Sequence, residues 1–214
     1  MSHKLHEHRK SYQKGMLTKD QAAADPVAQF GLWFEQVTQA SGIEEVNAMT
    51  LSTVDQQGYP RGRVVLLKHF DVRGFQFFTN YASQKGLAIA ANPQVSLSFF
   101  WPNLERQVHI KGKAEKLSQE ESQAYFAVRP KGSQIGAMAS PQSQVVESRA
   151  FLEQTLSRLE QQYQSDPVPK PDNWGGYLVK PIEFEFWQGR ENRLHDRLRY
   201  TAVNDKWTIE RLAP

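Results

Sequence analysis

The sequence predicts an α+β fold built on an antiparallel β-sheet, either closed into a barrel or stacked as a sandwich, with helices inserted between strands. Six or more short runs rich in β-branched and aromatic residues are separated by turn residues, as in "AMTLSTV", "GRVVLLKHF" and "QVSLSFFW". Helical patterns interrupt these runs without the strand–helix alternation of a parallel sheet. Neither GxGxxG nor GxxxxGK[ST] occurs, which excludes the common nucleotide-binding folds.

Composition narrows the class of protein further. With 39% hydrophobic and 23% charged residues in a chain of 214, we expect one globular domain of ordinary size. A net charge of +3, mostly interleaved, argues against nucleic acid as a partner. There is no apolar run long enough for a membrane span, no apolar signal-peptide core and no cysteine, so we expect a cytoplasmic protein without disulfides or thiolate chemistry.

Helix boundaries can be read from capping residues. Asp25 and Pro26 predict the start of an amphipathic helix that ends before Gly42. Ser118 and Glu121 form a capping box for a second helix, which Pro130 ends. Shorter helices are expected in "SQKGLAIAANP" and "GSQIGAMA", and a longer one over roughly 144–164.

One strand shows which face of the sheet is solvated. In "RQVHIKGKAEKL", Val108 and Ile110 alternate with Gln107, His109 and Lys111. Successive side chains of a strand point to opposite faces. The sheet is therefore expected to have one buried and one wet face.

The densest group of cations lies in "EFWQGRENRLHDRLRY". If this stretch is a strand, Arg193, His195 and Arg197 point to the same face. Their mutual repulsion requires either an anionic ligand or a neighbouring carboxylate. Glu185 or Asp196 could supply that carboxylate, so periodicity alone leaves a ligand site and an internal ion pair equally open.

Two other groups of cations are ambiguous when taken alone. Arg63 and Lys68 bracket "RVVLLK" at an odd separation, so either they serve different groups or one lies beyond the strand end. Tyr125 and Arg129 are four apart on one helix face, and Ser133 follows the expected helix end. Such patterns also occur on ordinary protein surfaces.

No motif in the sequence indicates a metal site or a hydrolase. His3, His6 and His8 lie in residues 1–24, which we expect to form a mobile N-terminal arm, and no HExxH motif occurs. Ser143 lacks the GxSxG context of a nucleophile. We therefore expect no metal site.

Several of these segments together resemble the pyridoxine/pyridoxamine 5'-phosphate oxidase family. The resemblance is carried by "RVVLLK", "FFTN" with "SQKG", "LERQVHIKGKAEKL", "YFAVRPKGSQIGAMASPQS", "EFWQGRENRLHDRLRY" and "RLAP". It covers nearly everything from Asp25 to Pro214, in the family's order. It implies a single FMN-binding split-barrel domain over residues 25–214 and a homodimer with FMN sites at the subunit interface.

The resemblance also implies an activity. Such an enzyme oxidises pyridoxine 5'-phosphate and pyridoxamine 5'-phosphate to pyridoxal 5'-phosphate with O2 as acceptor, giving H2O2, and NH3 from the amine, in vitamin B6 biosynthesis and salvage. Each site then holds two phosphate monoesters, those of the flavin and the substrate. A phosphate monoester carries close to two negative charges near neutral pH, which accounts for the clustered cations.

Site residues follow from the resemblance by matching positions in the motifs. The implied catalytic residues are Arg193, beside the reactive side of the substrate, and His195, which orients the ring oxygen. The implied substrate-binding residues are Arg9, Lys10, Ser11, Tyr12, Lys68, Tyr125, Arg129, Ser133, Arg193 and His195. The implied FMN-binding residues are Arg63, Val64, Val65, Leu66, Phe78, Thr79, Gln84, Lys85, Gln107, Gln142, Ser143, Trp187 and Arg197.

Two positions depart from the family pattern. Phe78 stands where tyrosine is frequent, and Gln84 where arginine is frequent before Lys85. The second change replaces a charge-assisted contact to the flavin phosphate and predicts weaker FMN binding, because a hydrogen bond to a charged group is worth about 1.5–3 kcal/mol. Two rival functions stay open: flavin reduction by a nicotinamide cofactor, and a carrier that only holds pyridoxal phosphate.

Overall fold

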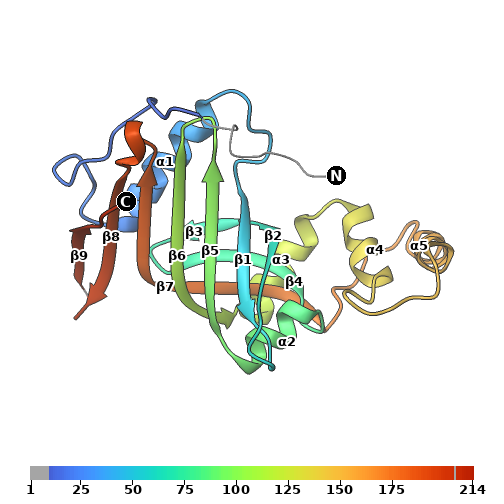
Figure 1. The fold of residues 1–214 in the computed structure, drawn as a ribbon. Coiled ribbons are helices and arrows are strands. Elements are labelled where there is room, and N and C mark those ends of the chain that lie inside the picture. Colours follow the sequence, from blue (N-terminus) through green and yellow to red (C-terminus); the bar gives the residue numbers. More distant parts are fainter. Residues whose placement is uncertain (1–9, 205) are drawn as a thin grey trace, which may run out of the picture. The chain divides into compact units, whose positions relative to one another are not determined.

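The computed structural model describes residues 10–204 and 206–214 and has the predicted α+β composition (Figure 1). The helices are α1 (Pro26–Gln39), α2 (Gln84–Ala91), α3 (Gln119–Val128), α4 (Lys131–Ala139) and α5 (Arg149–Gln162). The strands are β1 (Ala48–Val54), β2 (Pro60–Leu66), β3 (His69–Asp71), β4 (Gly74–Asn80), β5 (Gln94–Trp101), β6 (Arg106–Lys116), β7 (Trp174–Gln188), β8 (Asp196–Val203) and β9 (Lys206–Arg211).

The strands form a single hydrogen-bonded sheet in the order β2-β1-β5-β6-β7-β4-β3, and β8 and β9 extend from β7. Pairing of β7 with β4 and with β8 is antiparallel, as predicted. The chain divides into two compact units that alternate along the sequence. Unit 1 comprises residues 1–50, 96–111 and 181–214, and unit 2 comprises residues 51–95 and 112–180.

Unit 1 is organised around α1. Asp25 caps this helix by accepting a hydrogen bond from the Ala28 N–H, and Pro26 occupies its first turn, both as predicted. Trp33 meets the ring of Phe186 on β7 edge-on, at a centroid distance of 5.3 Å. The helix therefore buries its aromatic stripe against the strands of the same unit.

Unit 2 places three helices over a second apolar cluster. Phe126 of α3, Ile135 of α4 and Leu159 of α5 are buried there with Trp174 at the start of β7. Figure 1 shows α4 and α5 side by side in this unit. The cluster fixes the ends of α3 and α4, which carry several of the predicted site residues.

The helix predictions were confirmed in type and partly in length. The capping box of Ser118 and Glu121 is present, with both reciprocal hydrogen bonds. The fifth helix, expected from about residue 144, begins at Arg149 because the Ser148 hydroxyl accepts from the Phe151 N–H and caps it there. On this helix Leu159 is buried, whereas Phe151 is exposed.

The strand predictions were confirmed where alternation is strong. On β6, Val108 and Ile110 are buried while Gln107 and His109 are partly exposed. Lys68 lies beyond the last residue of β2, which settles the ambiguity left by its odd separation from Arg63.

The strand expected from residue 193 was wrong at residues 193–195 and confirmed from Asp196 onward. Glu191–Arg193 form a 3₁₀ turn in which Asn192 (φ 55°) and Arg193 (φ 62°) both have left-handed backbone conformations, and β8 begins only at Asp196. Two successive left-handed residues cannot continue a strand. Arg193 and Arg197 consequently do not belong to one strand face.

Residues 10–24, the described part of the expected N-terminal arm, contain no helix or strand. They are nevertheless held to unit 1, since Leu17 is buried and its backbone bonds to Asp196 and Arg211. Mobility of the arm and a single domain over residues 25–214 stay predictions. In the described part of the chain, no helix is long and apolar enough to cross a membrane.

Candidate functional site

Unit 2 contains a cavity of about 320 Å³, called here the Arg129 cavity. Lys68 reaches it from the segment between β2 and β3, and Tyr125 and Arg129 from the end of α3. Ser133 lies in the first turn of α4 and also lines the cavity. These four are among the residues that the resemblance implies for substrate binding, and they line one cavity. Further lining residues are Phe78, Thr79, Asn80, Gly136, Ala137, Ser140, Gln142 and Trp174.

Arg129 is a half-buried cation of this cavity. Its guanidinium lies 4.7 Å from the ring centroid of Trp174, which holds the side chain by a cation–π contact. Nη1 is buried and bonds to no described group. Burial lowers the pKa of Arg129, opposed by Tyr125, yet an arginine remains charged at neutral pH. A buried, charged and unpartnered donor suits an anionic ligand.

A stack of three aromatic rings forms one wall. Phe78 lies 3.9 Å from Tyr125 and 5.5 Å from Trp174, measured between ring centroids, with small interplanar angles. Phe78, which stands where the family often has tyrosine, contributes its ring to this wall. A flat apolar wall beside a cationic end matches an aromatic ring that carries a phosphate.

A second group of cations in unit 2, the Arg63–Lys85 group, lies on β2 and α2. Arg63 Nη1 donates to Leu51 O at 3.0 Å and to Thr53 Oγ1 at 2.9 Å. Lys85 Nζ donates to Thr79 Oγ1 at 3.3 Å and to Gln142 Oε1 at 3.0 Å. Within residues 10–204 and 206–214, neither cation forms an ion pair with a carboxylate.

The electrostatics of this group favour an anion. Burial lowers the pKa of Lys85, and the charge of Arg63 lowers it further. Burial likewise lowers the pKa of Arg63, with a smaller contribution from Arg61. Arg61 bonds to Gln84, the position where the family often has arginine, so Gln84 accepts a hydrogen bond instead of adding a charge. The unfavourable effect of Arg61 on Arg63, and of Arg63 on Lys85, would be relieved by a phosphate.

Unit 1 contains a separate cavity of about 490 Å³, the His195 cavity. Trp187 of β7 and the turn that follows it supply most of the lining, and the N-terminal arm supplies the rest. The ring of Trp187 lies 4.7 Å from that of His195. The lining residues are Lys10, Ser11, Tyr12, Trp187, Arg190, Asn192, Arg193 and His195.

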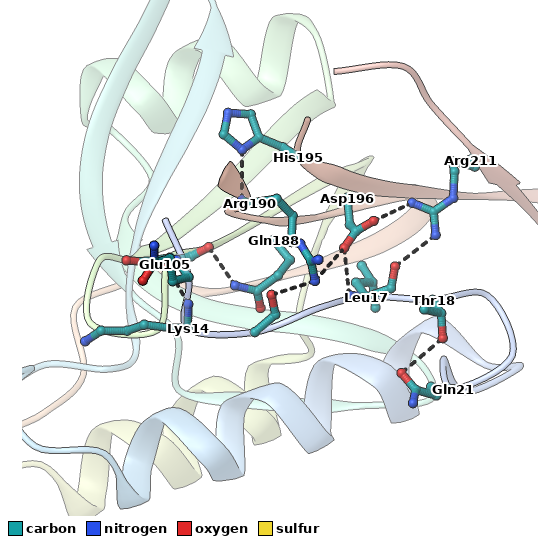
Figure 2. A network of polar contacts seen from close by, with 12 residues as sticks. Lys14, Leu17, Thr18, Gln21, Glu105, Gln188, Arg190, His195, Asp196 and Arg211 are labelled. Atoms are coloured by element: carbon teal, nitrogen blue, oxygen red, sulfur yellow. Dashed lines mark hydrogen bonds and ion pairs between the residues drawn. The ribbon is translucent and has the colours of Figure 1, made fainter. Parts of the chain in front are cut away.

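The orientation of His195 is fixed by the backbone. The Arg190 N–H donates to His195 Nδ1 at 3.1 Å (Figure 2). Since a backbone N–H can only donate, Nδ1 accepts, and the neutral imidazole carries its proton on Nε2. His195 therefore offers a hydrogen-bond donor through Nε2.

Two predicted FMN-binding residues, Gln107 and Arg197, line neither cavity. Arg197 Nε donates to Glu185 Oε1 at 2.8 Å, so the internal ion pair left open by the sequence is present. Gln107 Nε2 lies 2.6 Å from His109 Nε2 on the same strand. Burial lowers the pKa of His109, and Arg197 adds to this while Glu185 opposes it. Both predicted residues thus belong to a polar patch on the wet face of the sheet.

The structure thus gathers the predicted residues into groups. Lys68, Phe78, Thr79, Tyr125, Arg129, Ser133 and Gln142 share the Arg129 cavity. Lys10, Ser11, Tyr12, Trp187, Arg193 and His195 share the His195 cavity. Arg63 and Gln84 line a third, smaller cavity of unit 2. Of their neighbours on β2, Val64 is exposed, and Val65 and Leu66 are partly exposed. Ser143 follows Gln142 with a left-handed φ of 71°. Arg9 lies outside the described residues.

Sequence reasoning missed several residues of these cavities, among them Arg190, Asn192 and Trp174. Arg190 and Asn192 line the His195 cavity, and the high density of cations in "GRENR" could have pointed to Arg190. Trp174 was not singled out because it stands alone at the start of a strand. Its ring contacts come from residues distant in the sequence, which no local pattern reveals.

An antiparallel α+β protein with cavities lined by cations and aromatic rings belongs to the class of proteins whose sites suit small phosphorylated ring compounds. The family model described as pyridoxamine 5'-phosphate oxidase matches residues 36–163. The model of the pyridoxine 5'-phosphate oxidase C-terminal dimerisation region matches residues 174–214. The chain belongs to the pyridoxamine 5'-phosphate oxidase family.

Individual relatives agree over almost the whole length. A pyridoxine/pyridoxamine 5'-phosphate oxidase of Flavobacterium johnsoniae is 55% identical over 210 residues, which cover 98% of each chain. One of Salinibacter ruber is 51% identical, with 99% of each chain covered. The crystal structure of PhzG from Burkholderia lata 383, in complex with tetrahydrophenazine-1-carboxylic acid, has a TM-score of 0.87 at 27% identity and covers 93% of this chain and 98% of its own. The split-barrel fold expected from the motifs is confirmed.

Proposed function

We propose that the chain is an FMN-dependent oxidase of pyridoxine 5'-phosphate and pyridoxamine 5'-phosphate. It converts both to pyridoxal 5'-phosphate, transferring two electrons from the substrate to O2, which becomes H2O2. The amine substrate also releases NH3 after water is added. This is the reaction named for relatives that are 51–55% identical over nearly their full length.

The observation that carries the proposal is the unpartnered Nη1 of Arg129. It lies in a cavity with Lys68, the first turn of α4 and an aromatic wall. A phosphate oxygen would satisfy this donor, and the pyridine ring would pack on Tyr125 and Phe78. The Arg129 cavity is therefore the proposed site of the substrate phosphate.

The Arg63–Lys85 group fits the second phosphate, that of FMN. The charge of Arg63 lowers the pKa of Lys85, and neither cation has a carboxylate partner among the described residues, so a dianion there is favoured. Thr79 and Gln142, which already bond to Lys85, are further polar contacts for the cofactor. FMN, when bound, supplies the electron-accepting chemistry and the reaction with O2.

Arg193 and His195 are the proposed contacts of the reacting ring. His195 donates through Nε2 to the ring oxygen, because Nδ1 is occupied by the Arg190 N–H. Arg193, on its left-handed turn, keeps a permanent charge beside the substrate. Neither role requires a strong base, since the protein's task is to hold the substrate in place while the cofactor accepts electrons.

We propose a homodimer in which each site takes donors from both chains, consistent with the match to the dimerisation region over residues 174–214. Mixing Arg129→Ala and Arg193→Ala chains tests this, at a substrate concentration near the native KM, where each variant alone has little activity. Activity should recover to about a quarter of the native value, because half of randomly mixed dimers are heterodimers and each restores one of two sites. If every site belonged to one chain, mixing would recover nothing.

The experiment that tests the function is an anaerobic titration of the flavin-loaded protein with pyridoxamine 5'-phosphate. Loss of the oxidised flavin absorbance, followed by its return with H2O2 when O2 is admitted, is the expected result. Bleaching by a reduced nicotinamide but not by the vitamin would indicate the flavin reductase instead. A purified protein that binds pyridoxal phosphate without any flavin would indicate the carrier.

We also propose that the chain works in the cytoplasm. It has no cysteine, whereas proteins of oxidising compartments commonly use disulfides. Imaging of a fluorescently tagged chain in its own cell would test this location.

A further inference from the structure

Glu105, in the turn between β5 and β6, binds the N-terminal arm at three points. Its Oε2 accepts from the Gln13 N–H at 2.8 Å and the Lys14 N–H at 3.0 Å (Figure 2 shows the Lys14 contact). Its Oε1 lies 3.2 Å from Lys10 Nζ. The side chain is only 2% exposed. One buried carboxylate thus satisfies two backbone donors and one cation of a segment about ninety residues away.

The backbone of Glu105 is itself unusual. Its φ of 55° is in the left-handed region, which residues other than glycine rarely occupy. Glycine would adopt this conformation more easily, yet a buried acid stands here. The arm contacts account for a glutamate at this position, because the carboxylate has no other hydrogen-bond partner among the described residues.

The turn that carries Glu105 is fixed to the end of β7. The Gly189 N–H donates to Glu105 O at 2.7 Å, and Gln188 Nε2 donates to Leu104 O at 3.1 Å. A Cβ at Gly189 would lie 2.8 Å from Tyr12 Cγ and 3.0 Å from Glu105 Cβ. Tyr12, Glu105 and Gly189 are therefore packed so closely that no further carbon fits between them.

Tyr12 connects this packing to the His195 cavity. Its ring meets those of Trp187 and His195 at centroid distances of 5.7 Å and 5.8 Å. Lys10, Ser11 and Tyr12 together form the arm's share of the cavity lining. The two residues that follow, Gln13 and Lys14, are the ones whose N–H groups bond to Glu105. The arm is thus held directly beside the segment that lines the cavity.

We infer that Glu105 is a positioning residue, which holds arm residues 10–14 so that Lys10, Ser11 and Tyr12 complete the substrate side of the His195 cavity. This inference rests on the proposed function of that cavity. The alternative is that Glu105 only stabilises the turn between β5 and β6.

Three variants separate these explanations. Glu105→Gln keeps an oxygen that can accept from the arm but loses the ion pair with Lys10. Glu105→Ala loses both. Glu105→Gly also loses both but relieves the left-handed backbone, so it should melt at a higher temperature than Glu105→Ala. Glu183→Gln is the matched control, because Glu183 forms an ion pair with Lys111 at 2.7 Å and not with the arm.

The direct measurement is hydrogen–deuterium exchange of the Gln13 and Lys14 amides in the flavin-loaded protein. Glu105→Ala and Glu105→Gly should both exchange about tenfold faster than the native chain, Glu105→Gln less so, and Glu183→Gln at the native rate. Equal exchange in all variants would overturn the inference. So would exchange that follows the melting temperature, with Glu105→Gly protected and Glu105→Ala not.

Kinetics then test positioning for the reaction. Glu105→Ala should raise KM for pyridoxine 5'-phosphate about tenfold with the FMN content unchanged, because only the arm's contacts with substrate are loosened. Faster exchange with an unchanged KM and kcat would overturn the positioning role. If the native chain oxidises neither substrate, the proposed function fails, whereas the exchange result still decides whether Glu105 holds the arm.

Discussion

The Arg129 cavity and the His195 cavity are lined by similar side chains, but different kinds of secondary structure carry those side chains. In the Arg129 cavity, Tyr125 and Arg129 lie at the end of one helix and Ser133 in the first turn of the next. In the His195 cavity, Arg193 lies on a turn with two left-handed residues, and Tyr12 lies on an arm without helix or strand. One cavity is supported by regular structure and an apolar cluster, the other by individual polar contacts.

This difference assigns the two cavities separate tasks. A cation on a capped helix end, such as Arg129, is held in place before the ligand arrives and suits a fixed phosphate. A turn and an arm, as around Arg193 and Tyr12, can adjust around the reacting ring, because irregular segments open at lower free energy than packed helices. Variants of Arg129 should therefore weaken phosphate recognition, whereas loss of Arg193 beside the reacting ring should slow turnover.

The largest expected effect is that of Arg129→Ala. Loss of a charge-assisted contact to the phosphate should raise KM for pyridoxine 5'-phosphate about 100-fold, the upper part of the range for a hydrogen bond to a charged group. Steady-state O2 uptake measures it. Arg149→Ala is the control, because Arg149 is an exposed partner of Glu153 on α5. Equal loss with unphosphorylated pyridoxine as substrate would show that Arg129 does not recognise the phosphate.

Arg193→Ala should lower kcat about tenfold or more while leaving the flavin content unchanged, since the side chain contacts the substrate rather than the cofactor. Stopped-flow reduction of the bound flavin measures the rate, and the flavin absorbance of the purified protein measures the content. If the variant instead loses its flavin on purification, Arg193 contacts the cofactor and not the substrate. The two cavities would then not have the separate tasks proposed here.

Gln84→Arg tests the departure from the family pattern in unit 2. Restoring a cation beside the Arg63–Lys85 group should tighten FMN binding several-fold, less than a full charge-assisted hydrogen bond because Arg61 lies close enough to repel it. Quenching of FMN fluorescence on titration gives the dissociation constant. Gln84→Glu should act in the opposite direction, and tighter binding by that variant would exclude a phosphate at this position.

The smallest effect concerns the pH dependence of the arm contacts. Burial alone would raise the pKa of Glu105, but the Lys14 and Gln13 N–H groups and Lys10 outweigh it, and the net pKa is lowered. A lowered pKa stabilises the fold above the ordinary glutamate pKa of about 4.3, and this stabilisation is lost as the pH falls through the folded-state value.

The native chain should consequently melt about 3 °C above Glu105→Gln at neutral pH, which corresponds to roughly 1 kcal/mol for a chain of this size. The difference should disappear at pH values below the lowered pKa. Melting curves followed by circular dichroism at a series of pH values measure it. A difference that persists in acid would mean that the charge of Glu105 does not hold the arm.

Much of the secondary structure could be predicted because its causes are local. The cap at Asp25, the capping box at Ser118 and the alternation on β6 each depend on residues within a few positions of one another. Prediction failed at residues 193–195, where alternation suggested a strand. There the backbone conformation is decided by contacts such as that of His195 with Arg190, which periodicity does not contain.

The candidate site could be predicted less well than the secondary structure. Patterns in the residues left the cation groups ambiguous, and only the resemblance of several motifs in order assigned them to phosphates. The structure then separated Arg197, paired with Glu185, from Arg193, which lines the His195 cavity. It also revealed Arg190 and Trp174, whose partners are not determined by local sequence.

By itself the sequence determined the helix ends, the alternating strands and the family, because each depends on residue types at short spacing or in a fixed order. Only the tertiary structure decided which cations share a cavity, which are already paired, and that Glu105 holds an arm about ninety residues away. The physical reason is that a buried charge is stabilised by whatever lies within a few ångströms, and packing, not sequence separation, sets those neighbours.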